Sequence, residues 1–348
     1  MNFQIGSTMQ KKLFLGRLFM KTVLNLIAAV SSFFSRTFAY IVIVFALIAY
    51  FFPDGFTKIA PYIAYLLGIV MFGMGLTMQP KDFAEVLKRP VMVLSGVAGQ
   101  FILMPVIAYV LVFVFSFFTD MPEFSSIAAG VLLLGCCPGG TSSNVMSYLA
   151  KADVPLSVTI TACTTLLAPV VTPALFYLMA SQWVDIDPVA MFYSIIKIVI
   201  LPIVGGVIVN LLFKNAVKKV IVSLPLVSIV AIVAIVCAVV ALNAQRLAQT
   251  GAIIFVLVVL HNCIGYALGY LMGAIFKFRL SAKKTVAIEV GMQNSALSVT
   301  LAQNLAKTGA IDPIAAVPGA IFSVWHNISG PIVATIFANM KDKKDNSR

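Results

Sequence analysis

One acidic residue, Glu289, lies deep inside an apolar stretch, in the segment KKTVAIEVGMQNSALSVTLAQ. Gly291, Gln293, Asn294 and Ser295 follow it in the same segment. An ionised side chain at the centre of a bilayer costs about 2.5–3.5 kcal/mol on insertion scales, so such a residue is by default a candidate functional site. A carboxylate among amide, hydroxyl and carbonyl oxygens suits a hard, monovalent cation, whereas zinc or copper would require His or Cys ligands.

The charge at this centre limits what it can bind. Glu289 contributes one negative charge and two sodium ions would contribute two positive charges, which leaves the site ready for one monoanion. Anion binding is then favoured only after the cations are present, which couples the two. We therefore expect two Na+ as coupling ions, no other cofactor, and an organic anion. An ion pair between Glu289 and Lys197, a basic residue deep in another apolar stretch, is an alternative, but it leaves the amide and hydroxyl cluster unexplained.

A second polar interruption lies in the segment GVLLLGCCPGGTSSNVMSYLA. Pro138, Gly139 and Gly140 disfavour a continuous helix there, and the N-cap types Thr141-Ser142-Ser143-Asn144 follow at once. The pattern predicts a helix that stops at Cys137 or Pro138 and restarts near Thr141. Such a break must face a protein-lined or wet cavity, and the new helix N-terminus suits an anion.

Other polar residues occur at similar depth. Gln100 lies in the segment GVAGQFILMP, and Ser157 and Thr161 are four residues apart, hence on one helical face. Each alone is consistent with an ordinary hydrogen bond between helices, and we interpret His261 in this way too. The role of His326, beside Trp325, is left open.

These residues must be positioned by membrane helices. Of the 348 residues 61% are hydrophobic and 10% are charged, against about a quarter charged in soluble domains. The net charge of +12 does not indicate nucleic acid, because the basic residues lie in short connections between apolar runs. The five cysteines lack metal-ligand spacing and are interpreted as packing residues. The sequence predicts ten spans, at 38–52, 59–78, 90–118, 124–148, 155–181, 188–213, 220–242, 250–276, 283–306 and 313–339.

Lys and Arg orient these spans. They gather in the N-terminal segment, in the connections after spans two, four, six and eight, and in the tail, whereas the other connections are mainly acidic. Both termini are therefore expected in the cytoplasm. We expect a cytoplasmic lead-in at 1–37, a five-helix repeat at 38–181, a second five-helix repeat at 188–339 and a tail at 340–348. A duplicated unit with an odd number of spans inserts inverted, and the fourth span of each half is the polar, interrupted one.

Two other classes of protein fit less well. An intramembrane enzyme would need paired acids, a Ser/His couple or a metal cluster, and no second acid lies at this depth. A channel is less consistent than a carrier with interrupted helices in both halves.

The stretches GCCPGGTSSNVMSYLAKADVPLSVT, IEVGMQNSALSVTLA and VPGAIFSVWHNISG closely resemble the bile acid:sodium symporter family, over residues 22 to 340. The resemblance implies an all-α integral membrane fold with ten transmembrane helices. Spans one, two, six and seven would form a panel domain and the others a core domain, in which helices four and nine are broken and cross.

The resemblance also implies ligands. One sodium site would use Ser143, Asn144, Ser157, Thr161 and Glu289, and the other would use Gln100, Glu289, Gln293 and the carbonyls of Val290 and Met292. Thr141 and Asn294 would contact substrate at the crossing, with His326 and Asn327 as weaker candidates. Ala296 stands where relatives often have Gly, which bears on the shape of the cavity.

Family substrates include bile acids and small carboxylates such as pantoate or pyruvate. The resemblance therefore implies sodium-coupled symport of an organic anion by alternating access, by a monomer among the lipids of a bacterial inner membrane. Proton coupling through Glu289, or efflux, is the alternative within carriers.

Overall fold

The computed structural model describes residues 33, 37–79, 86–182 and 184–340, and these residues form helices and no named strand. The predicted lead-in and tail lie outside this part of the chain, apart from Phe33, Thr37 and Met340. The prediction of an all-α fold is confirmed.

Seven helices in the described residues are long and apolar enough to cross a membrane, so the chain is a multi-pass membrane protein. Several of them are composite. They comprise Pro53–Thr77 (α2, Pro53–Thr57; η1, Ala60–Tyr62; α3, Ile63–Thr77), Pro90–Ser116 (α5, Pro90–Ala98; η2, Gly99–Leu103; α6, Met104–Ser116), Val154–Ala180 (α9), Pro188–Leu212 (α10, Pro188–Ile195; η3, Ile196–Ile200; α11, Leu201–Leu212), Lys214–Leu242 (α12, Lys214–Val220; η4, Ile221–Ser223; α13, Leu224–Leu242), Ala244–Ile275 (α14) and Pro313–Asn339 (η5, Pro313–Ala316; α17, Val317–Asn339).

Shorter helices complete the described chain. The first predicted span corresponds to Thr37–Phe51. The fourth and ninth predicted spans each consist of two helices, α7 (Phe124–Cys136) with α8 (Ser142–Leu149), and α15 (Leu280–Gly291) with α16 (Ser295–Lys307).

Two of the long helices contain a π-helical turn just before a proline. η2 precedes Pro105 and η3 precedes Pro202. Proline lacks an N–H and its ring collides with the preceding turn, and a π-helical turn widens the helix locally. Gln100 is the second residue of η2, and Lys197 is the second residue of η3.

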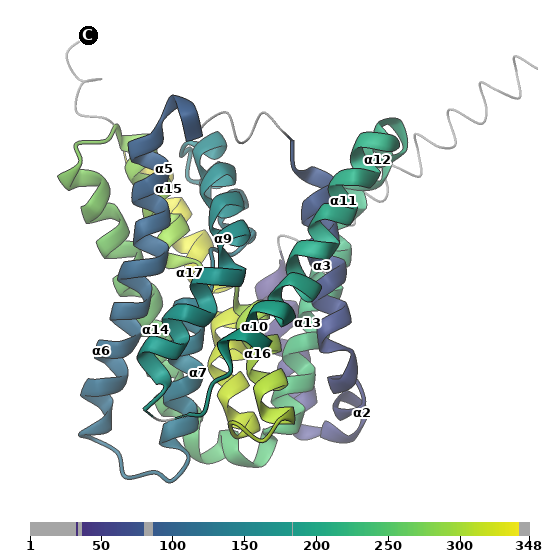
Figure 1. Ribbon diagram of the computed structural model, residues 1–348, viewed down its shortest axis with the longest axis vertical. Helices are drawn as coiled ribbons and strands as arrows, with labels where there is room; N and C mark the ends of the chain where they lie inside the picture. The colour runs from purple at the N-terminus through teal and green to yellow at the C-terminus, as the bar shows by residue number, and fades with distance from the viewer. Residues whose placement is uncertain (1–32, 34–36, 80–85, 183, 341–348) are drawn as a thin grey trace, which may run out of the picture.

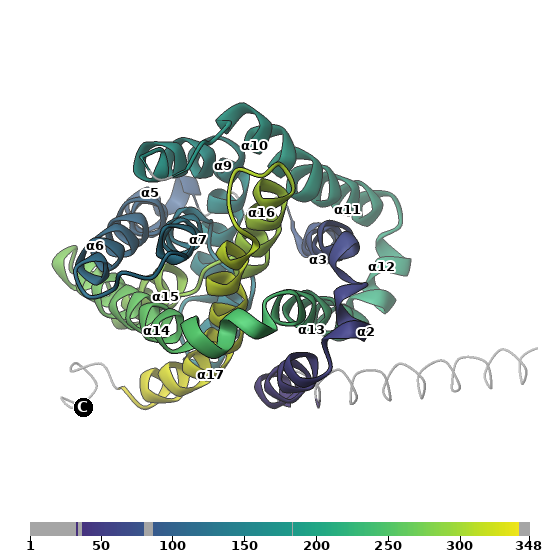
Figure 2. The ribbon, with the colours of Figure 1, turned by 90° about the horizontal axis from the view of Figure 1, so that it is seen from below.

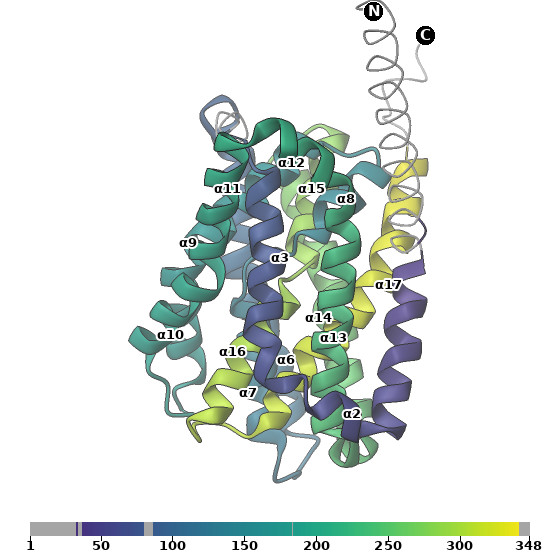
Figure 3. The ribbon, with the colours of Figure 1, turned by 90° about the vertical axis from the view of Figure 1, so that its right-hand side faces the viewer.

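The helices gather into two groups. In Figures 1 and 2, α3, α11 and α13 form one group, while α5, α6, α7, α9, α14 and α15 form the other, with α16 between them. α3 packs against α11 and α13, and α14 packs against α15. Figure 3 shows α12 and α15 toward one end of the molecule and α2 at the opposite end. The elements with many basic residues thus lie together at one end.

Candidate functional site

The breaks in the two interrupted spans pair with each other. Gly140 N donates to Met292 O (2.8 Å), and Asn294 N donates to Pro138 O (2.8 Å). These bonds form an isolated antiparallel bridge centred on Gly139 and Gln293. Backbone groups that lose their helical partners inside a membrane must be satisfied within the protein, and each break satisfies the other. The predicted stop near Cys137 and restart near Thr141 are confirmed.

The bridge depends on a glycine. A Cβ atom built on Gly140 would lie 2.6 Å from the carbonyl oxygen of Gln293, which is backbone and cannot turn aside. The two backbone segments at the breaks can therefore approach this closely only because residue 140 has no side chain.

Glu289 lies beside the bridge, and its exposed fraction is 1%. Its Oε1 accepts hydrogen bonds from Ser143 Oγ (2.6 Å) and Ser157 Oγ, and its Oε2 accepts from Thr161 Oγ1 (2.8 Å). Ser157 Oγ also lies 2.9 Å from Asn144 Oδ1, and Ser143 Oγ lies 3.3 Å from Thr161 Oγ1. The five residues predicted for the first sodium site therefore meet at one point, although they come from α8, α9 and α15.

The second predicted group surrounds Gly139. Gln100 Nε2 donates to Cys137 O (2.9 Å) and contacts the side-chain amide of Gln293. A Cβ atom on Gly139 would lie 3.4 Å from Glu289 Oε2 and 3.9 Å from Gln100 Oε1, so both oxygens face the same small space. Gln100 Oε1 is buried and has no hydrogen-bond donor.

Val290 and Met292, the other two residues predicted for the second sodium site, lie at the end of α15. Both are fully buried. The carbonyl of Ile288 accepts from Met292 N (3.1 Å), and that of Gly291 accepts from Asn262 Nδ2 (2.7 Å). The carbonyl of Val290 lies in the same last turn, where α-helical partners are lacking.

The residues predicted to contact substrate lie at or near the crossing. Thr141 is half-buried immediately before α8. Asn294 caps α16, because its Oδ1 accepts from Leu297 N (3.1 Å). These two side chains thus mark the N-terminal ends of both restarted helices.

His326 and Asn327 lie on α17, which covers the crossing. Gly330, one turn after His326, packs against Met146 and Met292. His326 is buried edge-on to Phe322, with its Nδ1 unpaired, and Asn327 Nδ2 donates within α17. Contact of these two residues with an anion stays a prediction.

The alternative ion pair between Glu289 and Lys197 is wrong. Lys197 is exposed, whereas the buried carboxylate of Glu289 is held by three hydroxyl groups. Within the described residues no ion pair involves Glu289. His261, in contrast, behaves as interpreted, with its Nε2 3.1 Å from Met104 O of a neighbouring helix.

A further polar network supports the end of α15. Asn262 Nδ2 donates to Gly291 O, Ser329 Oγ donates to Asn262 Oδ1 (2.7 Å), and Tyr266 OH lies 3.4 Å from Ser329 Oγ. Sequence reasoning missed Asn262 in this role. Its only signal was an amide next to His261 in an apolar run.

Thr164 was missed as well. Its Oγ1 accepts from Gly139 N (3.4 Å), so it supports the first break from α9. The signal was available in the sequence, because Thr164 lies three residues after Thr161 on the same helical face.

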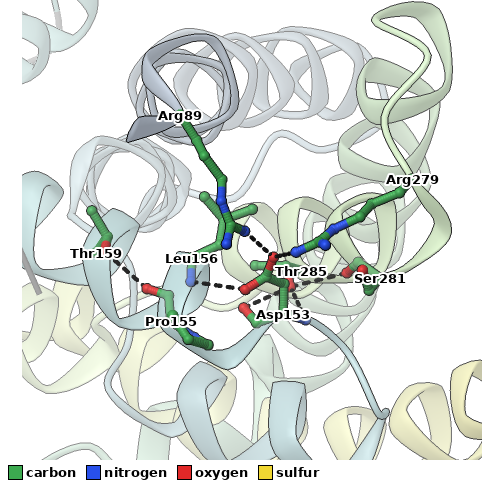
Figure 4. A network of polar contacts seen from close by, with 8 residues as sticks. All are labelled: Arg89, Asp153, Pro155, Leu156, Thr159, Arg279, Ser281 and Thr285. Carbon is green, nitrogen blue, oxygen red and sulfur yellow. Dashed lines mark hydrogen bonds and ion pairs between the residues drawn. The ribbon is translucent and has the colours of Figure 1, made fainter. Parts of the chain in front are cut away.

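An ion cluster lies one helical turn from the site (Figure 4). The side chain of Asp153 is 4% exposed and pairs with Arg89 (2.5 Å) and with Arg279. It also caps α9 by accepting from Leu156 N (3.3 Å). Burial raises the pKa of Asp153, but the hydrogen bonds from Arg279 and Leu156 and the two guanidinium charges outweigh it, so its pKa lies below the usual 3.8. Sequence reasoning missed this residue, although an acid just before Val-Pro is a helix-start signal.

Asp153 sets the register of α9 against α15. Its backbone N donates to Thr285 Oγ1 (2.8 Å), and Thr285 Oγ1 donates to the carbonyl of Asp153 (3.1 Å). One turn further along both helices, Ser157 meets Glu289. Two successive contacts, one helical turn apart, therefore join the same pair of helices: Asp153 with Thr285, and Ser157 with Glu289.

A multi-pass helical protein with a buried oxygen-lined site between two broken helices belongs to the class of membrane transporters. Residues 64–250 match the model of the sodium bile acid symporter family. The chain is 48% identical over 321 residues to an uncharacterized sodium-dependent transporter of Bacillus subtilis, YocS, covering 92% of this chain and 97% of that protein. It is 34% identical to the probable sodium/metabolite cotransporter BASS1 of Arabidopsis thaliana chloroplasts, covering 84% and 71% respectively. The rice BASS1 protein is 33% identical, covering 83% and 69%.

The chain belongs to the sodium bile acid symporter family. The predictions of a transporter, and of a protein that is not an enzyme, are confirmed by this membership.

Proposed function

We propose that the protein is a sodium-coupled symporter of an organic anion that works by alternating access. The observation that carries this proposal is the buried carboxylate of Glu289, which is surrounded by oxygen atoms and pairs with no basic side chain of the described residues. A buried carboxylate is costly unless a cation compensates it, and oxygen ligands suit sodium. The names of the relatives, which are sodium-dependent transporters or cotransporters, agree with this choice of ion.

The arrangement supports two sodium ions. The first would be held by Glu289 with the oxygens of Ser143, Asn144, Ser157 and Thr161. The second would be held near Gly139 by the ligands Gln100, Glu289, Val290, Met292 and Gln293. The unpaired Gln100 Oε1 favours the second site, since a buried acceptor normally has a partner and a cation would supply one.

The substrate would bind at the crossing once the cations are present. The N-terminal ends of α8 and α16 both lie there, next to Thr141 and Asn294, and helix N-termini favour negative charge. His326 and Asn327 would contribute from α17. We propose an anionic substrate that is either bile acid-like or a small carboxylate such as pantoate.

Alternating access would move the two groups of helices against each other. We propose ten spans in two inverted five-helix repeats, at 38–181 and 188–339, with a panel built around α3, α11 and α13. The basic end of the molecule would face the cytoplasm, which places both termini there, in a monomer of the bacterial inner membrane.

Uptake into proteoliposomes tests the proposal. Anions that stabilise the protein only with sodium present are first selected by thermal shift among carboxylates and bile salts. Wild-type protein and Glu123→Gln, a matched control outside the site, should accumulate such an anion under an inward sodium gradient and not under a potassium gradient. Glu289→Gln should abolish the sodium-driven component. Uptake that ignores sodium, or that survives in Glu289→Gln, would refute the proposal, and uptake driven by a proton gradient would favour proton coupling.

A further inference from the structure

A cleft of about 430 Å³ lies between the α10–η3 segment and α16, away from the crossing. Figures 1 and 2 show α10 and α16 side by side there. Its lining is Ala190, Tyr193, Ser194, Lys197, Ile198 and Asn304. Five of these residues are spaced three or four apart and share one face of the α10–η3 helix, so one side of the cleft is formed by a continuous helical face.

Lys197 lines this cleft near the middle of its span with an exposed side chain, and no ion pair involves it within the described part of the chain. Nine residues of helix separate it from Pro188, which corresponds to about 14 Å and is close to half of a bilayer about 30 Å thick. The helical elements that pack around it, α3, α9, α10, α11 and α16, contain no Asp or Glu. A cation at this depth is unfavourable unless an anion or water compensates it.

The neighbours of Lys197 can bind an oxyanion. Asn304 Nδ2 donates to Ser194 Oγ (3.0 Å), which ties α16 to α10 across the cleft. The hydroxyl proton of Ser194 remains available, since a hydroxyl both accepts and donates, and the phenol of Tyr193 is a second donor.

The backbone at Lys197 has the same local form as at Gln100. Both are the second residue of a π-helical turn that precedes a proline. Such turns occur often at functional sites, because they project side chains in directions that a regular helix does not offer.

We propose that this cleft is a second anion-binding site, in which Lys197, Ser194 and Tyr193 hold the carboxylate of the transported anion on its way to the crossing. The inference rests on the proposed function, since it concerns the same substrate. Lys197 balances the anion by itself, so binding here does not require sodium. The mid-membrane depth of Lys197 excludes a lipid headgroup as the occupant, because headgroup charges lie at the interface.

Transport kinetics in vesicles of phosphatidylcholine alone test the site. The probe is radiolabelled pantoate, or taurocholate if pantoate is not accumulated. Lys197→Gln should raise the external anion concentration for half-maximal uptake about tenfold, the low end of the contribution of a charge-assisted hydrogen bond, and leave the half-saturating sodium concentration unchanged. Lys197→Arg should stay near wild type. Lys58→Gln replaces an exposed lysine that directly follows α2 and does not line the cleft, so it is the matched control and should change neither value.

A labelling experiment does not depend on transport. In a variant whose native cysteines are replaced, Lys197→Cys should react with an anionic, membrane-impermeant methanethiosulfonate, and the probe anion should slow the reaction equally with and without sodium.

Three results would overturn the site. They are an unchanged half-saturating anion concentration in Lys197→Gln, a shift that appears only when anionic lipid is added, and labelling that the anion does not slow. Uptake that is indifferent to sodium would overturn the proposed function alone, since the response to Lys197→Gln and the protection of the cysteine still decide the cleft.

Discussion

Replacing Gly140, which is not itself a proposed cation ligand, by alanine should damage cation binding by displacing the backbone of Gln293 and Met292. The added Cβ would lie 2.6 Å from the carbonyl oxygen and 3.1 Å from the carbonyl carbon of Gln293. Both atoms are backbone, so the two breaks must separate. Separation weakens the bonds from Gly140 N to Met292 O and from Asn294 N to Pro138 O.

The expected cost follows from these contacts. Overpacking in a tight core costs about 1–3 kcal/mol. Two backbone hydrogen bonds contribute about 0.5–1.5 kcal/mol each, so their loss brings the total to roughly 2–6 kcal/mol. If the substitution destabilises the sodium-bound state by only about 2 kcal/mol more than the sodium-free state, the half-saturating sodium concentration rises about 30-fold.

Sodium-dependent uptake and thermal unfolding with and without sodium measure the effect. Gly68→Ala is the matched control, because its Cβ would meet Pro202 at an ordinary 3.7 Å and alanine favours the helix. A Gly140→Ala protein with wild-type stability and wild-type sodium dependence would show that the bridge does not position the cation ligands.

Three other substitutions give distinct outcomes. The ionised Asp153 stabilises the folded protein fully above its unfolded pKa, and this stabilisation is lost as the pH falls through its lowered folded pKa. Asp153→Asn should therefore unfold at a lower temperature than wild type at pH 7. Its unfolding temperature should fall less than that of wild type when the pH is lowered below 3.8, which scanning fluorimetry across pH measures. Asn262→Leu leaves the buried carbonyl of Gly291 without its donor and should cost about 1–3 kcal/mol, with a raised half-saturating sodium concentration; equal sodium dependence would contradict this. Arg246→Gln removes a half-exposed pair with Asp312 and should change the unfolding free energy by less than about 1 kcal/mol in a denaturant titration.

The sequence predicted the breaks better than it predicted the boundaries of the long helices. Pro138, Gly139 and Gly140 in an apolar run admit few structures, and the helix does end there. The start of α14 lies at Ala244, six residues before the predicted start of that span, because polar residues such as Arg246 were taken for a connection. An amphipathic first turn outside the hydrocarbon has no hydrophobic signal to mark it.

Single polar residues in an apolar run could be named from the sequence, but their partners could not. Glu289 and Ser157 were conspicuous because the membrane tolerates few polar groups. That Asn262 supports Gly291, or that Asp153 meets Thr285, depends on helix packing between distant segments, and no local pattern encodes it. For Lys197 the sequence suggested a partner that is wrong. Its depth in an apolar run made an ion pair with Glu289 conceivable, but the helices place the two side chains apart.

The bridge between the two breaks also affects how the chain is made. Ser143 and Glu289 are 146 residues apart, so at about 5–20 residues per second the ribosome finishes the second break roughly 7–30 s after the first. During that interval the carbonyl of Pro138 and the amide of Gly140 lack the partners that the second break supplies, whereas Gly139 N and Cys137 O can already bond Thr164 and Gln100 of the first half. Until the second break is made, these two groups need water or other protein partners, so we expect the first half alone to be less stable in the membrane than the same segment in the complete chain.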